Sequence, residues 1–170
     1  MNNLKGVLRL TTTMFLFVGL VGIWMGGCQT QEQKVERLIR QLQDQDPNVR
    51  GNAAITLGSI GTRDAVHTLI QTLQNDQDAE VRKGVVLVLG SIGSEDVVPA
   101  LIQALQDQEW KVRSNTARAL ETIGEGAKDA VPTLIQLLQD PEVVYRAEEA
   151  LKSIGIPEAL EAVKKYRSRQ

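Results

Sequence analysis

The segment that decides the fold is DAEVRKGVVLVLGSIG at residues 78–93, because three other segments repeat its pattern without gaps. They are DPNVRGNAAITLGSIG (46–61), EWKVRSNTARALETIG (109–124) and DPEVVYRAEEALKSIG (140–155). The closing glycines of the four segments lie 32, 31 and 31 residues apart. A repeat of this length is typical of solenoids, in which each copy forms one small structural unit.

Each copy of this first series predicts one helix with defined ends. An acidic residue stands where the N-cap belongs, and in two copies a proline follows at the first helical position, as in Asp46-Pro47 and Asp140-Pro141. The closing glycine favours a left-handed helix stop. Apolar residues recur between these ends at helical spacing, for example Val49, Ala53, Leu57 and Ile60.

A second, interleaved series predicts another helix in each repeat. Its copies span residues 35–43, 65–74, 97–106 and 130–139, with a degenerate copy at 157–166. Neither helix of a pair can bury its apolar stripe alone, so neighbouring pairs must share a core. We therefore expect an all-α, right-handed solenoid with nine helices from Val35 onward, one capping helix and four antiparallel pairs, and no strand. Its centre should be the helix of residues 79–92, where Val85, Leu87, Val88 and Leu89 predict burial on several sides.

This pattern resembles the HEAT repeat, in the short form seen in phycobilisome-lyase-type HEAT-like proteins. The match rests on Val-Arg at 49–50, 81–82 and 112–113, on Ala-Leu or its equivalent near 56–57 and 119–120, and on Gly-x-Ile-Gly at 58–61 and 90–93. It covers about residues 33–167 and places a HEAT-like repeat domain at 34–167. The resemblance implies the fold and leaves the partner open, because HEAT arrays serve very different partners.

The N-terminal residues 1–27 predict a secretory signal peptide. Basic Lys5 and Arg9 precede an uncharged apolar run of residues 14–25. The following Met25-Gly26-Gly27-Cys28 resembles the bacterial lipobox, with Met25 in place of the usual leucine. The resemblance implies lipid on Cys28, a lipidated tether at 28–33, and a membrane-anchored lipoprotein of the cell envelope facing the periplasm or exterior. The alternative is an uncleaved membrane anchor that starts from Leu10.

Composition argues against several classes of partner and cofactor. The chain has 19 basic and 21 acidic residues, and removal of Lys5 and Arg9 with the signal peptide leaves 17 against 21. This balance gives no reason to expect nucleic acid, which needs a concentrated basic surface. One cysteine, Cys28, and one histidine, His67, cannot build a Cys or multi-His metal cage. We expect no metal and no cofactor.

Four groups of residues are candidates for binding. Arg50, Arg82 and Arg113 form a column that either binds an acidic partner or makes an internal ladder, with Asp46, Asp78 and Glu109 as the obvious acids. Trp110 either anchors a partner or packs over its own inter-helix turn. The basic run 164–169 either ends its helix favourably or contacts anionic lipid. The fourth group consists of two glutamine columns on the second helices, Gln71, Gln103 and Gln136, with Arg40 ahead of them, and Gln43, Gln74, Gln106 and Gln139.

The function predicted from these features is a membrane-tethered, non-catalytic scaffold for an unknown protein or extended peptide. In HEAT arrays the second helices line the concave side, so the column of Gln71, Gln103 and Gln136 is the preferred binding strip. No catalytic residues are predicted. The alternative is a phycobilin lyase-like enzyme, lyase subunit or chaperone acting on phycobiliproteins. The HEAT-fold deoxyhypusine hydroxylases share the architecture, but they rely on repeated His-Glu pairs that this sequence lacks.

Overall fold

The computed structural model describes residues 30–169, in which nine α-helices and two short 3-10 segments occur without any strand. The predicted all-α solenoid with nine helices is confirmed for this part of the chain. The described residues belong to two units, with the boundary between Glu36 and Arg37. No helix among the described residues is long and apolar enough to cross a lipid bilayer. The predicted signal peptide and Cys28 lie outside the described residues.

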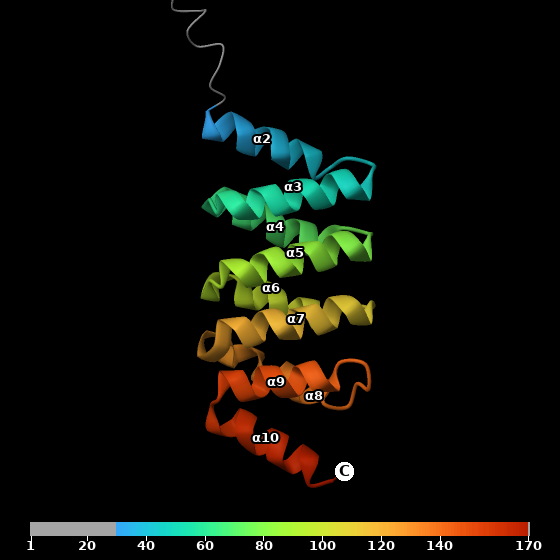
Figure 1. Ribbon diagram of the computed structural model, residues 1–170, viewed down its shortest axis with the longest axis vertical. Helices are drawn as coiled ribbons and strands as arrows, with labels where there is room; N and C mark the ends of the chain where they lie inside the picture. The colour runs from blue at the N-terminus through green and yellow to red at the C-terminus, as the bar shows by residue number, and fades with distance from the viewer. Residues whose placement is uncertain (1–29, 170) are drawn as a thin grey trace, which may run out of the picture. The chain divides into compact units, whose positions relative to one another are not determined.

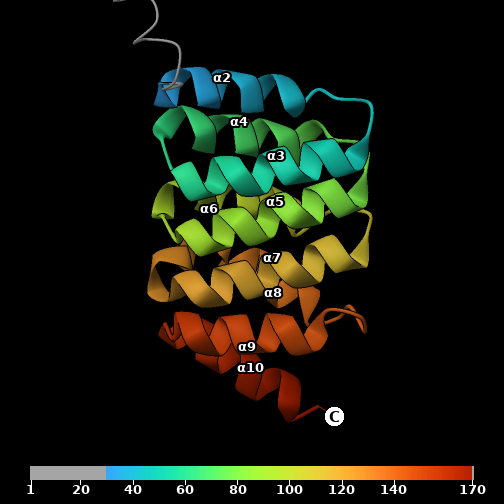
Figure 2. The same cartoon turned by 45° about the horizontal axis from the view of Figure 1, so that its top comes forward.

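The helices of the second unit form two layers (Figure 1). The first-series helices follow one another down the stack, and α4, α6 and α8 lie behind them; the turned view of Figure 2 shows the same order. The first series consists of α3 (Pro47–Ile60), α5 (Ala79–Ile92), α7 (Trp110–Ile123) and α9 (Val144–Ile154). The second series consists of α4 (Arg63–Asn75), α6 (Val98–Ala104), α8 (Val131–Leu137) and α10 (Pro157–Arg167).

The capping helix α2 (Gln31–Gln41) begins earlier than expected, inside the segment predicted to be a tether. The cause is local, because the Oγ1 of Thr30 accepts a hydrogen bond from the backbone N–H of Gln33 at 3.4 Å. Thr30-x-x-Gln33 is a helix-start signature that the prediction overlooked. The fourth first-series helix shows the opposite shift. It begins at Val144 because residues 141–143 form a turn after Asp140, so the predicted Asp140-Pro141 helix start is wrong.

Two of the second-series helices are shorter than predicted. Helices α6 and α8 have seven residues each, and 3-10 segments at 95–97 and 124–130 lead into them. Pro99 and Pro132 stand in their first turns, where a residue without an N–H is tolerated. His67 occupies the same slot in α4, which runs as one continuous helix of 13 residues. At the position equivalent to His67, the two shorter helices α6 and α8 have a proline.

Close approach within the first-series layer depends on two glycines. A Cβ added to Gly58 of α3 would lie 2.0 Å from Cγ1 of Val88 in α5, and a Cβ on Gly90 of α5 would lie 2.7 Å from Cβ of Ala119 in α7. Both distances are far below van der Waals contact, so only glycine permits this helix spacing. The core below these contacts is aliphatic and includes fully buried Leu57, Leu69, Leu89, Leu101, Leu120 and Leu134.

Helix α5 is covered on three sides and not on the fourth. It packs against α3, α4 and α7, and Leu89 has no exposed surface. Leu87, by contrast, keeps 41% of its surface exposed. The expectation that this helix is buried on several sides therefore fails at Leu87, because a two-layer stack leaves the outer face of each first-series helix open.

At the C-terminal end of the first-series layer, the core is closed by charged side chains. Lys152 Nζ lies 2.8 Å from Glu148 and 2.7 Å from Glu149, and Arg167 of α10 also pairs with Glu148. Hydrogen bonding from Lys152 and Arg167 outweighs burial and holds the pKa of Glu148 below its usual value. Glu148 stands where the other repeats place Ala54, Val86 and Ala117, so the last repeat ends the apolar core.

We predict that Leu89→Ala lowers the free energy of unfolding by about 2–5 kcal/mol, the usual cost of truncating a fully buried leucine. The matched control is Leu160→Ala on α10, which should lower the free energy of unfolding much less, because Leu160 keeps 47% of its surface exposed. Urea titration followed by circular dichroism measures both values. Equal losses from the two variants would contradict the burial of Leu89.

Candidate binding surface

Three arginines link the loops between successive repeats along one edge of the stack. Arg50 Nε and Nη2 donate to the carboxylate of Asp76 at 2.7 and 2.9 Å, and Arg82 makes the same pair of bonds to Asp107 at 2.7 and 2.8 Å. Arg113 donates through both nitrogens to Oδ2 of Asp140, at 3.0 and 2.7 Å. The chain of interactions ends there, because Val144 replaces the arginine in the fourth copy.

Each arginine also holds the loop before its own helix. Nη1 of Arg82 donates to the carbonyls of Asp76 and Gln77 at 2.8 and 3.0 Å, and Arg50 and Arg113 do the same in their loops.

The acids paired with the arginines are not the expected Asp46, Asp78 and Glu109, which stand at the helix starts. They lie two residues earlier, or at Asp140 for the last pair. A recurring Asp-x-Asp/Glu at 44–46, 76–78 and 107–109 was the sequence signal for them.

The carboxylates of this ladder are stabilised in their charged form. Burial opposes the charge on Asp76, but the hydrogen bonds from Arg50 and from the Asp78 N–H outweigh it and lower the pKa of Asp76. The pKa values of Asp107 and Asp140 are lowered for the same reasons, with Arg82 and Arg113 as the donors. The side chains of Arg82 and Asp107 are only 15% and 10% exposed, so this column serves the fold and offers little to a partner.

The face of the second-series helices carries grooves between neighbouring helices. One of about 420 Å³ lies between α4 and α6, and another of about 290 Å³ lies between α2 and α4 within the second unit. A third of about 330 Å³ lies between α8 and α10. Glutamines from both predicted columns line them: Gln43 and Gln71 in the α2–α4 groove, Gln74, Gln103 and Gln106 in the α4–α6 groove, and Gln139 in the α8–α10 groove.

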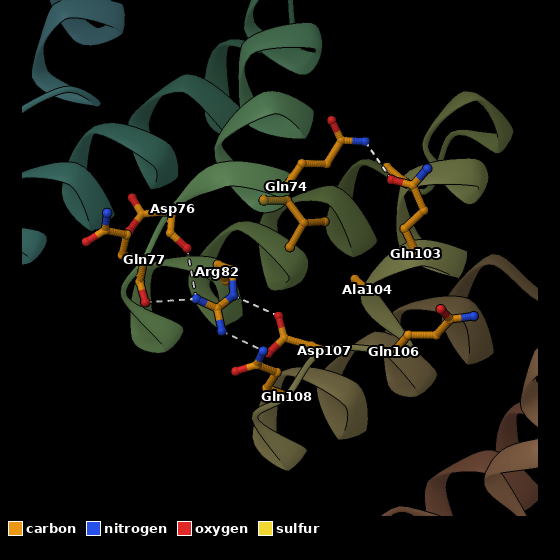
Figure 3. Close-up of a pocket in the computed structure, with 11 residues that line it drawn as sticks. Gln74, Asp76, Gln77, Arg82, Gln103, Ala104, Gln106, Asp107 and Gln108 are labelled. Carbon is orange, nitrogen blue, oxygen red and sulfur yellow. Dashed lines mark hydrogen bonds and ion pairs between the residues drawn. The ribbon is translucent and has the colours of Figure 1, made fainter.

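Figure 3 shows how the central groove is built. Gln74 of α4 reaches across to Gln103 of α6 and donates to its Oε1 at 2.7 Å, while Arg82 and Asp107 form the ladder contact lower in the groove. The two glutamine columns thus meet across the groove. Gln71, Gln103 and Gln136 are all exposed, and Gln71 donates to Nε2 of His67 at 3.1 Å.

The other candidate residues lie apart from these grooves or play local parts. Trp110 is the first residue of α7, is 39% exposed, and has Lys111 Nζ 6.0 Å from its ring centroid. Within the basic run, Lys165 and Arg169 line the α8–α10 groove beside Glu158 and Glu161. Among residues 30–169, no three His, Cys, Asp or Glu side chains gather closely enough to hold a metal ion.

The family model for HEAT repeats matches residues 35–120 and 98–169, which together span most of the chain. The chain belongs to the HEAT-repeat family. Sequence comparison finds no significant match among proteins of curated function. The assignment of this protein to the HEAT family therefore rests on its repeats and on its fold.

Solved structures with the same fold include three of different origin. An engineered protein is 27% identical, with a TM-score of 0.54 over 78% of this chain and 68% of its own. The complex of CpcE and CpcF of phycocyanin lyase from Nostoc sp. PCC7120 is 25% identical, with a TM-score of 0.62 over 85% of this chain and 66% of that one. Human deoxyhypusine hydroxylase is 25% identical, with a TM-score of 0.60 over 81% of this chain but only 46% of its own.

We predict that the ladder makes the HEAT domain sensitive to acid. A carboxylate whose pKa is lowered by folding contributes stability that is fully present above its unfolded pKa of about 3.9, and that is lost as the pH falls through the lower folded value. Stability should therefore decline below about pH 4.

Asp107→Asn should lower the free energy of unfolding by about 1.5–3 kcal/mol at pH 7, which is the usual contribution of a hydrogen bond to a charged group. The stability of this variant should also decline less steeply in acid. Asp129→Asn, at an exposed site, is the control and should behave like the wild type. Urea midpoints between pH 2 and pH 7 test this, and parallel pH profiles for wild type and Asp107→Asn would refute it.

Proposed function

We propose that this HEAT protein is a non-catalytic scaffold that binds an extended polypeptide along the face of its second-series helices. The supporting observation is the glutamine-lined groove between α4 and α6, which has counterparts between α2 and α4 and between α8 and α10. Gln103 accepts a hydrogen bond from Gln74 through Oε1, and its own amide N–H groups are donors that could bind a ligand. Side-chain amides both donate and accept, as a peptide backbone requires.

The repeat spacing suits an extended chain. Packed helices lie about 10 Å apart, and an extended peptide advances about 3.3 Å per residue. In the polyproline II conformation the rise is about 3.1 Å with three residues per turn, so every third residue lies on the same side. One repeat then corresponds to about three ligand residues, and a glutamine from each repeat can meet every third backbone group. Because this recognition uses uncharged hydrogen-bonding groups, binding should depend only modestly on salt.

The peptide-binding proposal is tested by affinity capture from envelope extract with the full chain, followed by mass spectrometry. We predict that proteins retained by the wild type are lost from a Gln71, Gln103 and Gln136→Ala triple variant, because this variant removes the column of side-chain amides proposed to bind the peptide backbone. Gln45→Ala with Asn48→Ala, two exposed amides removed outside the grooves, is the control and should retain them. Retention by the triple variant together with loss in Trp110→Ala would move the site to the start of α7.

We further propose that lipid on Cys28 tethers the scaffold to a membrane of the cell envelope. The support is the order of basic residues, apolar run and Gly26-Gly27-Cys28, with the only cysteine of the chain at the lipobox position. Several acyl chains hold a protein to a bilayer where one would not.

We predict that Cys28→Ser yields an unprocessed precursor that incorporates no labelled fatty acid, whereas the wild type is labelled and shortened. The measurement is metabolic labelling with a palmitate analogue followed by gel analysis. Normal labelling and processing of Cys28→Ser would exclude the lipoprotein proposal.

A second candidate function is a subunit or chaperone of a phycobilin lyase. It is favoured by the similarity to the CpcE–CpcF complex of phycocyanin lyase, which extends over 85% of this chain. Cell fractionation separates the two proposals. A chain recovered from the cytoplasm with an intact N-terminus would favour the lyase, whereas a processed chain in the envelope would favour the tethered scaffold.

A further inference from the structure

The outer face of the first-series layer carries an apolar groove that the peptide-binding proposal does not use. The groove lies between α3 and α5, has a volume of about 520 Å³, and is lined by uncharged residues that include Ile55, Gly58, Gly84, Leu87 and Val88. Ile55 and Leu87 stand on its rim with 58% and 41% of their surfaces exposed. Large aliphatic side chains gathered around a groove are typical of a protein interface.

Gly84 has no role inside the chain that requires a glycine. No atom lies within 4 Å of a Cβ added to it, in contrast to Gly58 and Gly90. Glycine is among the least favourable residues for a helix interior, so its presence on an exposed face calls for an external reason. It leaves an open site one helical turn before Leu87, on the same face of α5.

We propose that this face is the interface of a symmetric homodimer, in which Leu87 of each copy fills the open site above Gly84 of the other. In this arrangement the two α5 helices run antiparallel, and the two-fold axis lies in the interface along the stack. The interface is isologous, because Leu87 of the first copy packs at Gly84 of the second, and Leu87 of the second copy packs at Gly84 of the first.

The charges on the neighbouring helices agree with this register. Because the repeats place equivalent residues in rows, the same operation sets Ile55 opposite Asn52 of the second copy on α3 and Arg118 opposite Asn115 on α7. On α9 it sets Glu149 of each copy opposite Arg146 of the other. Arg118 belongs to the same surface, since it lines the adjoining α5–α7 groove together with Leu87.

A shift of the register to leucine against leucine is unfavourable. It would set Arg118 opposite Arg118 and Glu149 opposite Glu149, and like charges held together at an interface weaken binding. The charge pattern therefore favours the pairing of Leu87 with Gly84. In this pairing, the missing side chain of Gly84 provides the space that Leu87 of the other copy occupies.

The test is the mass of the full-length chain by sedimentation equilibrium, in a detergent density-matched to the buffer, at protein concentrations up to about 1 mM. We expect a reversible dimer. Leu87→Glu should be monomeric at all concentrations, whereas Leu160→Glu, at an exposed leucine of α10, should dimerise like the wild type. A monomeric wild type, or a Leu87→Glu dimer of undiminished strength, would overturn the proposal.

Two further variants test the register itself. Gly84→Leu fills the open site, and no atom of the chain lies within 4 Å of a Cβ at this position, so it should abolish the dimer while the helical circular dichroism is retained. Glu149→Arg should weaken the dimer at least tenfold, and the second change Arg146→Glu should restore it by reversing both charges. A dimer that tolerates Gly84→Leu, or one that the charge swap fails to rescue, would overturn the antiparallel α5 pairing.

Discussion

The half-buried arginine that bridges one inter-repeat loop to the next is the interaction on which the stack depends. Through Nη1, Arg82 holds the loop that starts its own helix, and through Nε and Nη2 it holds Asp107 at the start of the next repeat. Asp107 in turn accepts the Glu109 N–H at 2.9 Å, so the acid shapes its loop as well. Repetition of this contact at Arg50 and Arg113 sets the spacing of the repeats. A lysine, with a single donor atom, cannot make the same set of bonds.

Two glycines allow the first-series helices to pack closely once the arginine ladder holds the loops. With the loops held on one edge, Gly58 and Gly90 allow α3, α5 and α7 to pack directly against one another. The second-series helices contact one another less closely and keep grooves between them. The two layers therefore present different chemistry, with glutamine-lined grooves on one face and an apolar groove with exposed aliphatic side chains on the other. This difference underlies the assignment of a peptide to the first face and a second copy of the chain to the second.

The last repeat shows how the stack ends. Val144 in place of the ladder arginine leaves Asp140 as the final acid. Glu148 replaces the small or apolar residues that earlier repeats use for packing, and it pairs with Lys152. Arg167 then ties α10 to Glu148. Because these substitutions are charged and mutually paired, they close the core without creating a new apolar edge.

The repeated sequence alone determined the class of fold, the number of helices among residues 30–169 and the apolar stripes that supply the core, because helical periodicity and closing glycines are local properties of the chain. The glutamine columns and the arginine column could also be read from repeat spacing. Tertiary structure decided which acid each arginine meets, since Asp76 and Asp107 come close only when one repeat stacks on the next. It also decided that Leu87 is exposed while Leu89 is buried. Both belong to one continuous apolar run, and only the side of α5 that α3, α4 and α7 leave uncovered distinguishes them.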